Sequence, residues 1–186
     1  MKRSIRVLGA LAAVLAGAWA SVSAGANPTA LAVIESRSDS KVTGKAIFTQ
    51  LSNGKTRVEV TISGATPGMH GLHIHEKGDC SAPDATSAGG HFNAAGNPHA
   101  GPTDAKHHNG DFGNIKIGTD GKGKLKLETD MLTVTEGPNS VVGKAVIFHE
   151  KVDDLKTQPT GDAGARFGCG VVVLTPTGKA NAQKIR

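Results

Sequence analysis

The apolar residues of the chain fall into short runs separated by glycine, asparagine and serine. Residues 56–62 alternate apolar and polar side chains, which is typical of a strand with one buried face. Turn residues precede this run at 52–55 and separate two later runs at 119–123. No stretch after residue 24 keeps a 3.6-residue period over three helical turns. Strands are predicted over residues 30–34, 44–51, 56–62, 115–117, 125–127, 141–142, 144–149 and 171–174.

This pattern predicts an all-β domain with eight short strands, built as a sandwich or closed barrel with Greek-key connections. Two long segments without periodicity, about 76–112 and 150–168, interrupt the strands. Loops of this length in a compact domain are usually functional. The domain core is expected over about residues 30–175, and the polar, basic segment 177–186 is expected to be a frayed tail.

The first 24 residues have the composition of a secretory signal peptide. Basic residues at positions 2, 3 and 6 precede an apolar run from Val7 to Ala20, which is too short to span a bilayer comfortably. Small residues allow cleavage after Ala20, Ala24 or Ala26, and Ala24 is favoured over the others. The alternative is a membrane anchor. Cleavage would leave a single domain over residues 25–186, with no membrane contact and a periplasmic location.

Removal of this leader changes the charge argument. The whole chain has a formal net charge of +5, and loss of its three basic leader residues lowers this value to +2. The basic character is therefore partly a property of the leader, and no nucleic-acid partner is inferred. The two cysteines, Cys80 and Cys169, are predicted to form one disulfide in an oxidising compartment, with two buried free thiols as the alternative.

Histidine is concentrated in one part of the chain. Seven of the eight histidines lie between residues 68 and 111, and His149 follows alone on an apolar strand. His73 and His75 are separated by one residue, so they share one face of a strand. Three imidazoles and one carboxylate form a common zinc ligand set, and imidazole-rich sites also suit copper. A metal site is therefore predicted, although a lone His-x-His pair on a strand is more often solvated.

Five longer motifs carry more specific information: His70-Gly-Leu-His-Ile-His75, Ser87-Ala-Gly-Gly-His-Phe-Asn93, His108-Asn-Gly-Asp-Phe-Gly-Asn114, His149-Glu-Lys-Val-Asp-Asp154 and Gly161-Asp-Ala-Gly-Ala-Arg-Phe-Gly-Cys-Gly-Val171. Through these motifs the chain resembles bacterial, periplasmic-type copper/zinc superoxide dismutases over roughly residues 42–175. Departures from the family pattern are small: Leu72 stands where Phe is common, and Ala94 where Pro often follows His-Phe-Asn. Neither position supplies a ligand.

The resemblance implies two metal ions, copper and zinc, that share the imidazole of His91. It also implies that the enzyme converts superoxide to dioxygen and hydrogen peroxide through redox cycling of copper, with His91 supplying a proton and zinc holding the loop. The copper ligands would be His73, His75, His91 and His149. The zinc ligands would be His91, His99, His108 and Asp111.

The resemblance assigns further roles around the metals. Asp153 would accept hydrogen bonds from one copper and one zinc histidine, and Arg166 would attract and bind the superoxide anion beside copper. His70 would be structural, and Lys151 and Lys156 could help to steer the anion or simply be solvated. His107 is expected to be exposed and idle, because its spacing to Gly110-Asp111 favours His108 as the ligand.

Two other classes of protein stay open. A copper or zinc carrier could use the same fold without turnover, although carriers derived from such enzymes typically lack copper ligands or the arginine. A zinc hydrolase needs an open zinc position, which four protein ligands would close. Superoxide is the expected substrate, and the oligomeric state is open between a monomer and a homodimer.

Overall fold

The structure, a computed structural model, describes residues 27–176, and these residues form an all-β domain. The predicted signal peptide, residues 1–24, and the predicted tail, residues 177–186, lie outside the described residues. A short 3₁₀ turn, η1 (Thr86–Ala88), lies within the first long loop. The strands are β1 (Thr29–Ser36), β2 (Thr43–Gln50), β3 (Thr56–Ser63), β4 (Gly68–His75), β5 (Asp111–Ile117), β6 (Lys122–Thr129), β7 (Ala145–His149), β8 (Arg166–Val171) and β9 (Val173–Thr175).

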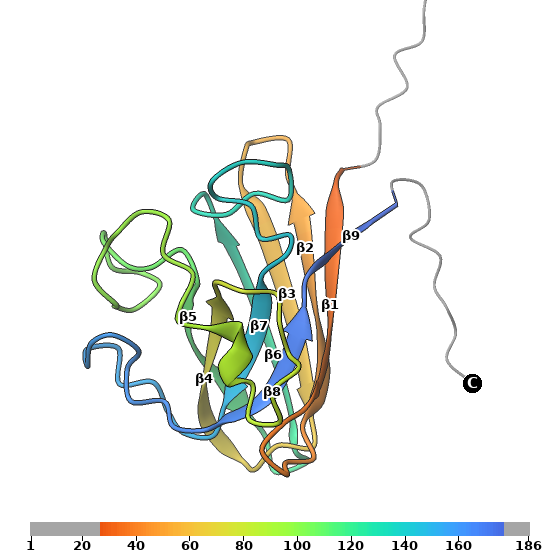
Figure 1. Cartoon of the computed structure of the whole chain (residues 1–186), viewed down its shortest axis with the longest axis vertical. Coiled ribbons are helices and arrows are strands. Elements are labelled where there is room, and N and C mark those ends of the chain that lie inside the picture. Colours follow the sequence, from red (N-terminus) through yellow and green to blue (C-terminus); the bar gives the residue numbers. More distant parts are fainter. Residues whose placement is uncertain (1–26, 177–186) are drawn as a thin grey trace, which may run out of the picture.

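The strands close into one antiparallel barrel (Figure 1). Its order is β2-β3-β6-β5-β4-β7-β8-β1, and β1 pairs with β2 to complete the ring. Strand β9 follows β8 after a break at Val172 and also pairs with β1. Because β3 lies beside β6 and β4 beside β5 and β7, the chain crosses between non-neighbouring strands, as in a Greek key. The predicted all-β barrel is confirmed.

Alternation along the strands places the apolar core inside the barrel. On β3, Val58, Val60 and Ile62 are buried, while the residues between them are partly exposed. Each fully buried valine, leucine or phenylalanine side chain contributes about 1.5–3 kcal/mol relative to an exposed one. Within residues 27–176, no helix is long and apolar enough to cross a membrane.

Strand β4 uses the same alternation to separate core from metal chemistry. Leu72 and Ile74 belong to the core cluster and are fully buried. His73 and His75 point to the opposite face of the strand, yet they are also fully buried. Loops must therefore cover the outer face of β4. The two long loops, residues 76–110 and 150–165, leave the barrel on the same side (Figure 1).

Two expectations about the strands were wrong. Val141 and Val142 form no strand; they lie in a third long loop, 130–144, from which Val141 packs into the core. The last strand region begins at Arg166 rather than at 171, and its first residues pair with β7. The glycines of this segment hid it from a propensity argument. Strand β1 lies so close that a Cβ at Gly170 would be 2.5 Å from the carbonyl oxygen of Val33.

Candidate metal centre

The folded chain brings the predicted ligands into two adjacent groups that share His91. In each group, one nitrogen or carboxylate oxygen from every residue lies within 4.8 Å of the others, and all of the residues are buried. We call these sets the copper group (His73, His75, His91 and His149) and the zinc group (His91, His99, His108 and Asp111).

In the copper group, hydrogen bonds at one ring nitrogen leave the other nitrogen free. Nδ1 of His75 donates to the carbonyl oxygen of Gly89 at 2.9 Å. Nδ1 of His149 lies 3.3 Å from the carbonyl oxygen of Gly164. Nε2 of His73 instead bonds the carboxylate of Asp153. Each bond fixes the tautomer, so the unbonded nitrogen carries a lone pair.

Those unbonded nitrogens are buried and have no hydrogen-bond partner among residues 27–176: Nδ1 of His73, and Nε2 of His75, His91 and His149. Buried polar atoms without partners are costly, and a metal ion would satisfy all four together. Four imidazole nitrogens suit copper. The orphaned atoms therefore fit the copper that the ligand set implies.

Burial also keeps the imidazoles of His73, His75 and His149 uncharged. Desolvation lowers the pKa of His73 to about 4, although the hydrogen bond that its ring donates to Asp153 raises it. Desolvation, with repulsion from neighbouring histidines, holds the pKa of His75 and His149 well below the usual value. Neutral imidazole is the form that ligates metals. The copper group is thus ready to bind at neutral pH without losing a proton from these three rings.

In the zinc group, three ring nitrogens converge on one carboxylate oxygen. Oδ1 of Asp111 lies 2.9 Å from Nδ1 of His91, 3.1 Å from Nδ1 of His99 and 3.4 Å from Nδ1 of His108. Zinc bonds of about 2.0–2.1 Å to tetrahedral ligands require separations of about 3.3 Å between those ligands. Although Nδ1 of His99 is close to Oδ1 of Asp111, the two atoms are not aligned for a hydrogen bond. This arrangement fits a tetrahedral zinc.

Asp153 connects the two groups. Its Oδ1 accepts a hydrogen bond from Nε2 of His99 at 3.0 Å, and its Oδ2 bonds His73. Burial lowers the pKa of His99, but Asp111 and Asp153 together outweigh this effect and raise it to about 9. Despite the opposing effect of burial, the same bonds hold the pKa of Asp153 well below its usual range. At Gly161, with φ of 70°, a Cβ would overlap Oδ1 of Asp153, so glycine is required there.

Arg166 lies at the first position of β8, opposite His149 in the register of β7. Its Nη1 and Nη2 donate to the carbonyl oxygens of Ala85 and Gly89, each at 2.8 Å. Gly89 thus accepts hydrogen bonds from both Arg166 and His75. A guanidinium with two fixed donors is pre-organised beside the copper group.

The predicted disulfide is present. Cys80 and Cys169 are bonded, which closes a sequence separation of 89 residues. Cys169 lies on β8, three residues after Arg166, and Cys80 begins the loop segment that reaches Gly89. The disulfide therefore ties the loop that holds the Arg166 guanidinium to the strand that carries it.

His107 was wrongly expected to be exposed: it is buried, at 8% exposure, and its Nδ1 donates to the carbonyl oxygen of His108 at 2.7 Å. His70 is buried against the ring of Phe148, and its Nδ1 contacts the carbonyl oxygen of His149 at 3.1 Å. Lys151 and Lys156 are exposed.

Two polar side chains that sequence reasoning missed hold the loops. Asn114 exchanges two 2.8 Å hydrogen bonds with the backbone of Asp153. Gln158 does the same with the backbone of His99, at 2.9 and 2.8 Å. Asn114 is the last residue of the motif 108–114, in which only the ligands His108 and Asp111 were predicted to have a role. Gln158 lies in a loop without periodicity and belongs to none of the motifs.

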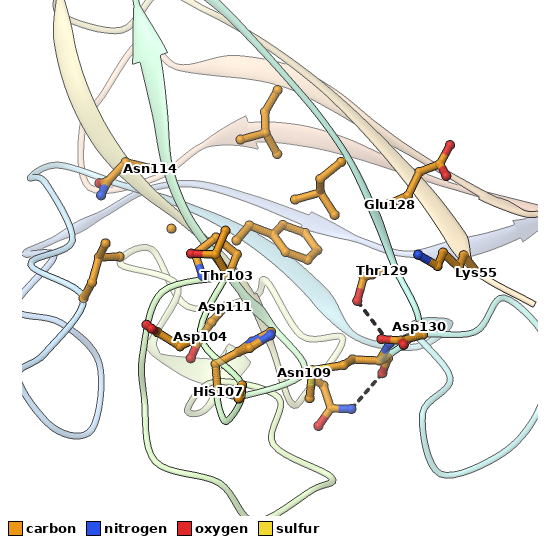
Figure 2. Close-up of a pocket in the computed structure, with 18 of the residues that line it drawn as sticks. Lys55, Thr103, Asp104, His107, Asn109, Asp111, Asn114, Glu128, Thr129 and Asp130 are labelled. Atoms are coloured by element: carbon orange, nitrogen blue, oxygen red, sulfur yellow. Dashed lines mark hydrogen bonds between the residues drawn. The ribbon is translucent and has the colours of Figure 1, made fainter.

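A cavity of about 770 Å³ lies between the loop of residues 76–110 and strands β5 and β6 (Figure 2). Asp111 and His107 line it, together with apolar residues such as Phe112 and Met131. None of the copper-group histidines borders this cavity, and neither does Arg166. The cavity is therefore separate from the face of the metal centre where Arg166 lies.

The fold and the site together define a β-barrel protein with adjacent ligand sets compatible with copper and zinc. The family model of copper/zinc superoxide dismutase matches residues 42–172, more than half of the chain. The chain belongs to the copper/zinc superoxide dismutase family. One similar solved structure is described as a crystal structure analysis of the clock protein EA4. It is 36% identical, with a TM-score of 0.73 over 80% of this chain and 96% of that chain.

Proposed function

We propose that this chain is a bacterial, periplasmic copper/zinc superoxide dismutase, which converts superoxide to dioxygen and hydrogen peroxide. The observation that carries this proposal is the pairing of four converging, unprotonated imidazole nitrogens with a fixed guanidinium. The first feature suits a redox metal. The second suits a small anion, which has too little surface to be recognised by shape.

The copper ligands would be His73, His75, His91 and His149, and the zinc ligands would be His91, His99, His108 and Asp111. Copper bound there would supply one-electron redox chemistry: the electron lost by one superoxide as dioxygen forms reduces a second superoxide, which takes up two protons to become hydrogen peroxide. Zinc has no redox chemistry, so its ligand set orients His91 and organises the loop.

The chain's own groups then have defined tasks. Arg166 attracts superoxide and hydrogen-bonds it, while the carbonyls of Ala85 and Gly89 keep the guanidinium in place. The zinc group holds Nδ1 of His91, which leaves Nε2 as the ring nitrogen that faces the copper group. When this Nε2 carries a proton in place of a metal, it can donate that proton to the reduced substrate. Arg166 and His91 are thus the proposed catalytic residues, and Asp153 orients His73 and His99.

A second candidate is a metal-binding protein on this fold without turnover. The observation that favours it is the name of the similar structure, a clock protein, which mentions no enzymatic activity. In favour of the enzyme, this chain has both ligand groups and an Arg166 guanidinium that is bonded to the Ala85 carbonyl.

Superoxide decay, followed by stopped flow, separates the two candidates. We expect copper- and zinc-loaded protein to accelerate decay in proportion to its bound copper, and copper-free protein to have no effect. Protein with a full complement of copper that leaves superoxide at its spontaneous rate of decay would exclude the enzyme and favour the carrier.

Export is tested separately. We expect the protein to appear in the periplasmic fraction of a bacterial host, with a mature N-terminus at Gly25 or near it. Retention of residues 1–24 in a membrane fraction would contradict signal-peptide cleavage. The mass of the exported protein in solution distinguishes a monomer from a homodimer.

A further inference from the structure

The turn between β1 and β2, residues 37–42, is bonded to the strand that begins with Arg166. The backbone N–H of Arg37 donates to the carbonyl oxygen of Phe167 at 2.9 Å. The hydroxyl of Ser38 donates to the carbonyl oxygen of Arg166 itself at 3.0 Å, and the hydroxyl of Ser40 also donates to Phe167. The turn therefore fixes the backbone from which the Arg166 side chain extends.

The same turn is bonded to the loop that begins at Cys80. Nε and Nη2 of Arg37 both donate to the carbonyl oxygen of Cys80, at 3.0 and 2.9 Å. The backbone N–H of Ser38 donates to the carbonyl oxygen of Pro83 at 2.9 Å. Nη1 of Arg37 donates to Ser36 at 2.7 Å, so all three guanidinium nitrogens are used. Only 18% of the Arg37 side chain is exposed.

These two sets of bonds meet at Arg166. Its guanidinium donates to Ala85 and Gly89, which lie at the far end of the loop that Arg37 holds. One turn thus fixes both the backbone of Arg166 and the loop that carries the acceptors of its side chain. The disulfide joins the Cys80 side chain to β8, while Arg37 holds the Cys80 carbonyl from the turn after β1.

The backbone of the turn is consistent with a role beyond joining two strands. Ser38 and Asp39 have φ of 52° and 56°, in the left-handed region that non-glycine residues seldom adopt. Short hairpin turns usually place Asn or Gly at such positions. A left-handed conformation at two successive non-glycine residues persists where surrounding contacts impose it. Here the contacts with Pro83, Arg166 and Phe167 are of that kind.

We propose that Arg37 is a positioning residue that sets the location of the Arg166 guanidinium through the Cys80–Gly89 loop. The proposal rests on the anion-binding role given to Arg166 under the proposed function. Arg37 does not touch the substrate. It acts by limiting how far the carbonyls of Ala85 and Gly89 can move from the copper group.

The test compares Arg37→Met and Arg37→Lys with a matched control, Arg57→Met. Arg57 is an arginine on β3 that pairs with Glu128 on the barrel surface. The Met variants keep the aliphatic length and remove the guanidinium. The Lys variant keeps the charge but loses the forked donors. Arg166→Lys identifies the Arg166 side-chain signals in the spectra.

The first readout is the NMR spectrum of the Arg166 side chain in zinc-loaded, copper-free protein. Two bonded Nη groups restrict rotation, so we expect separate Nη signals in the wild type and in Arg57→Met. These signals should broaden or merge in Arg37→Met. The second readout is azide affinity of the copper-loaded protein, which should weaken between about threefold and about tenfold, the loss of roughly one hydrogen bond. The azide affinity of Arg37→Lys should lie between those of the wild type and Arg37→Met.

Unchanged Arg166 signals and unchanged azide affinity in Arg37→Met, with only a lower melting temperature, would overturn the proposal. Ser38→Ala provides a second variant, which removes only the bond to the Arg166 carbonyl and should shift the same signals. If Arg37→Met does not fold, Arg37→Lys and Ser38→Ala replace it as the test. In that case, Arg166 signals and azide affinities of Arg37→Lys and Ser38→Ala that both equal those of the wild type overturn the proposal.

The outcomes also separate this inference from the proposed function. Copper-loaded wild type without superoxide turnover, but with Arg166 signals that respond to Arg37→Met, would refute the enzyme and leave the positioning role intact. An Arg37→Met protein with full superoxide turnover and wild-type spectra would support the enzyme and refute the positioning role of Arg37.

Discussion

Nε2 of His73 donates a hydrogen bond to Oδ2 of Asp153 at 2.8 Å, across 80 residues of sequence. The other carboxylate oxygen accepts from His99. One buried carboxylate therefore orients a copper-group ring and a zinc-group ring together. Such partners fix the tautomer of a ligand and increase its basicity.

Replacement of Asp153 by Asn should weaken both sites. The amide is nearly isosteric, but one of its two acceptor positions becomes a donor, which opposes a ring N–H. We expect zinc affinity to fall by about 10- to 100-fold, with a smaller loss for copper. Competition with a chromogenic chelator measures both. Asp154→Asn is the matched control, because Asp154 is exposed and its carboxylate accepts hydrogen bonds from Lys156 and Thr157 of its own loop. Equal affinities in the two variants would contradict this role.

The two ligand groups predict opposite metal losses. His149→Ala removes a copper-group nitrogen without touching the zinc group, and His108→Ala does the reverse. We expect each variant to lose more than about 100-fold in affinity for one metal, since direct ligation exceeds the effect of an orienting partner. Analysis of bound copper and zinc after dialysis measures which metal each variant loses. His149→Ala with full copper occupancy and full activity would overturn the ligand assignment.

Zinc uptake should release a proton at neutral pH. In the metal-free protein the pKa of His99 is raised to about 9, so its ring is protonated at pH 7 and must lose a proton to bind zinc. This release should decline as pH rises through 9. The charged ring also stabilises the metal-free fold, fully below the unfolded pKa of about 6.5, and this stability is lost as pH rises through 9. Calorimetry in buffers of different ionisation enthalpy gives the proton count. Zinc binding without proton release at pH 7 would contradict the assignment.

Reduction of the disulfide should loosen the loop before the barrel unfolds. The crosslink closes 89 residues of separation, for which the chain-entropy model gives about 4–5 kcal/mol, or roughly 10–20 °C in melting temperature. Hydrogen exchange should accelerate first at residues 80–90, while amides of β2 and β3 stay protected. Unchanged exchange and metal retention in protein shown to be reduced would refute the tether.

Arg166→Glu should slow turnover by about 10- to 1,000-fold and invert its dependence on salt. Coulomb attraction between unit charges 4 Å apart is about 4 kcal/mol at an effective dielectric constant near 20. Arg166→Lys should retain much of the activity, because it keeps the charge. Both metals should stay bound in either variant, since Arg166 ligates neither. Rates against ionic strength provide the measurement, and equal slopes in all three proteins would exclude guidance by Arg166.

The alternating run 56–62 and the His-x-His pair at 73 and 75 predicted their strands well, because one buried face leaves a period of two. Residues 166–170 could not be recognised in this way, because close packing against β1 requires glycines that propensity assigns to turns. Local signals also missed Gln158 and the burial of His107. The bonds of Gln158 join two distant loops, and the bond from Asn97 to the His107 carbonyl spans ten residues of one irregular loop, so no short window of sequence predicts either.

The two faces of β4 have a consequence for insertions and deletions. Core side chains and metal-facing side chains alternate along this strand, so a deletion of one residue near Leu72 would exchange the two sets. Histidines would then enter the apolar interior, and aliphatic side chains would face the ions. Homologous chains should therefore vary in length within residues 94–98 or 130–144 far more readily than by a single codon in β4.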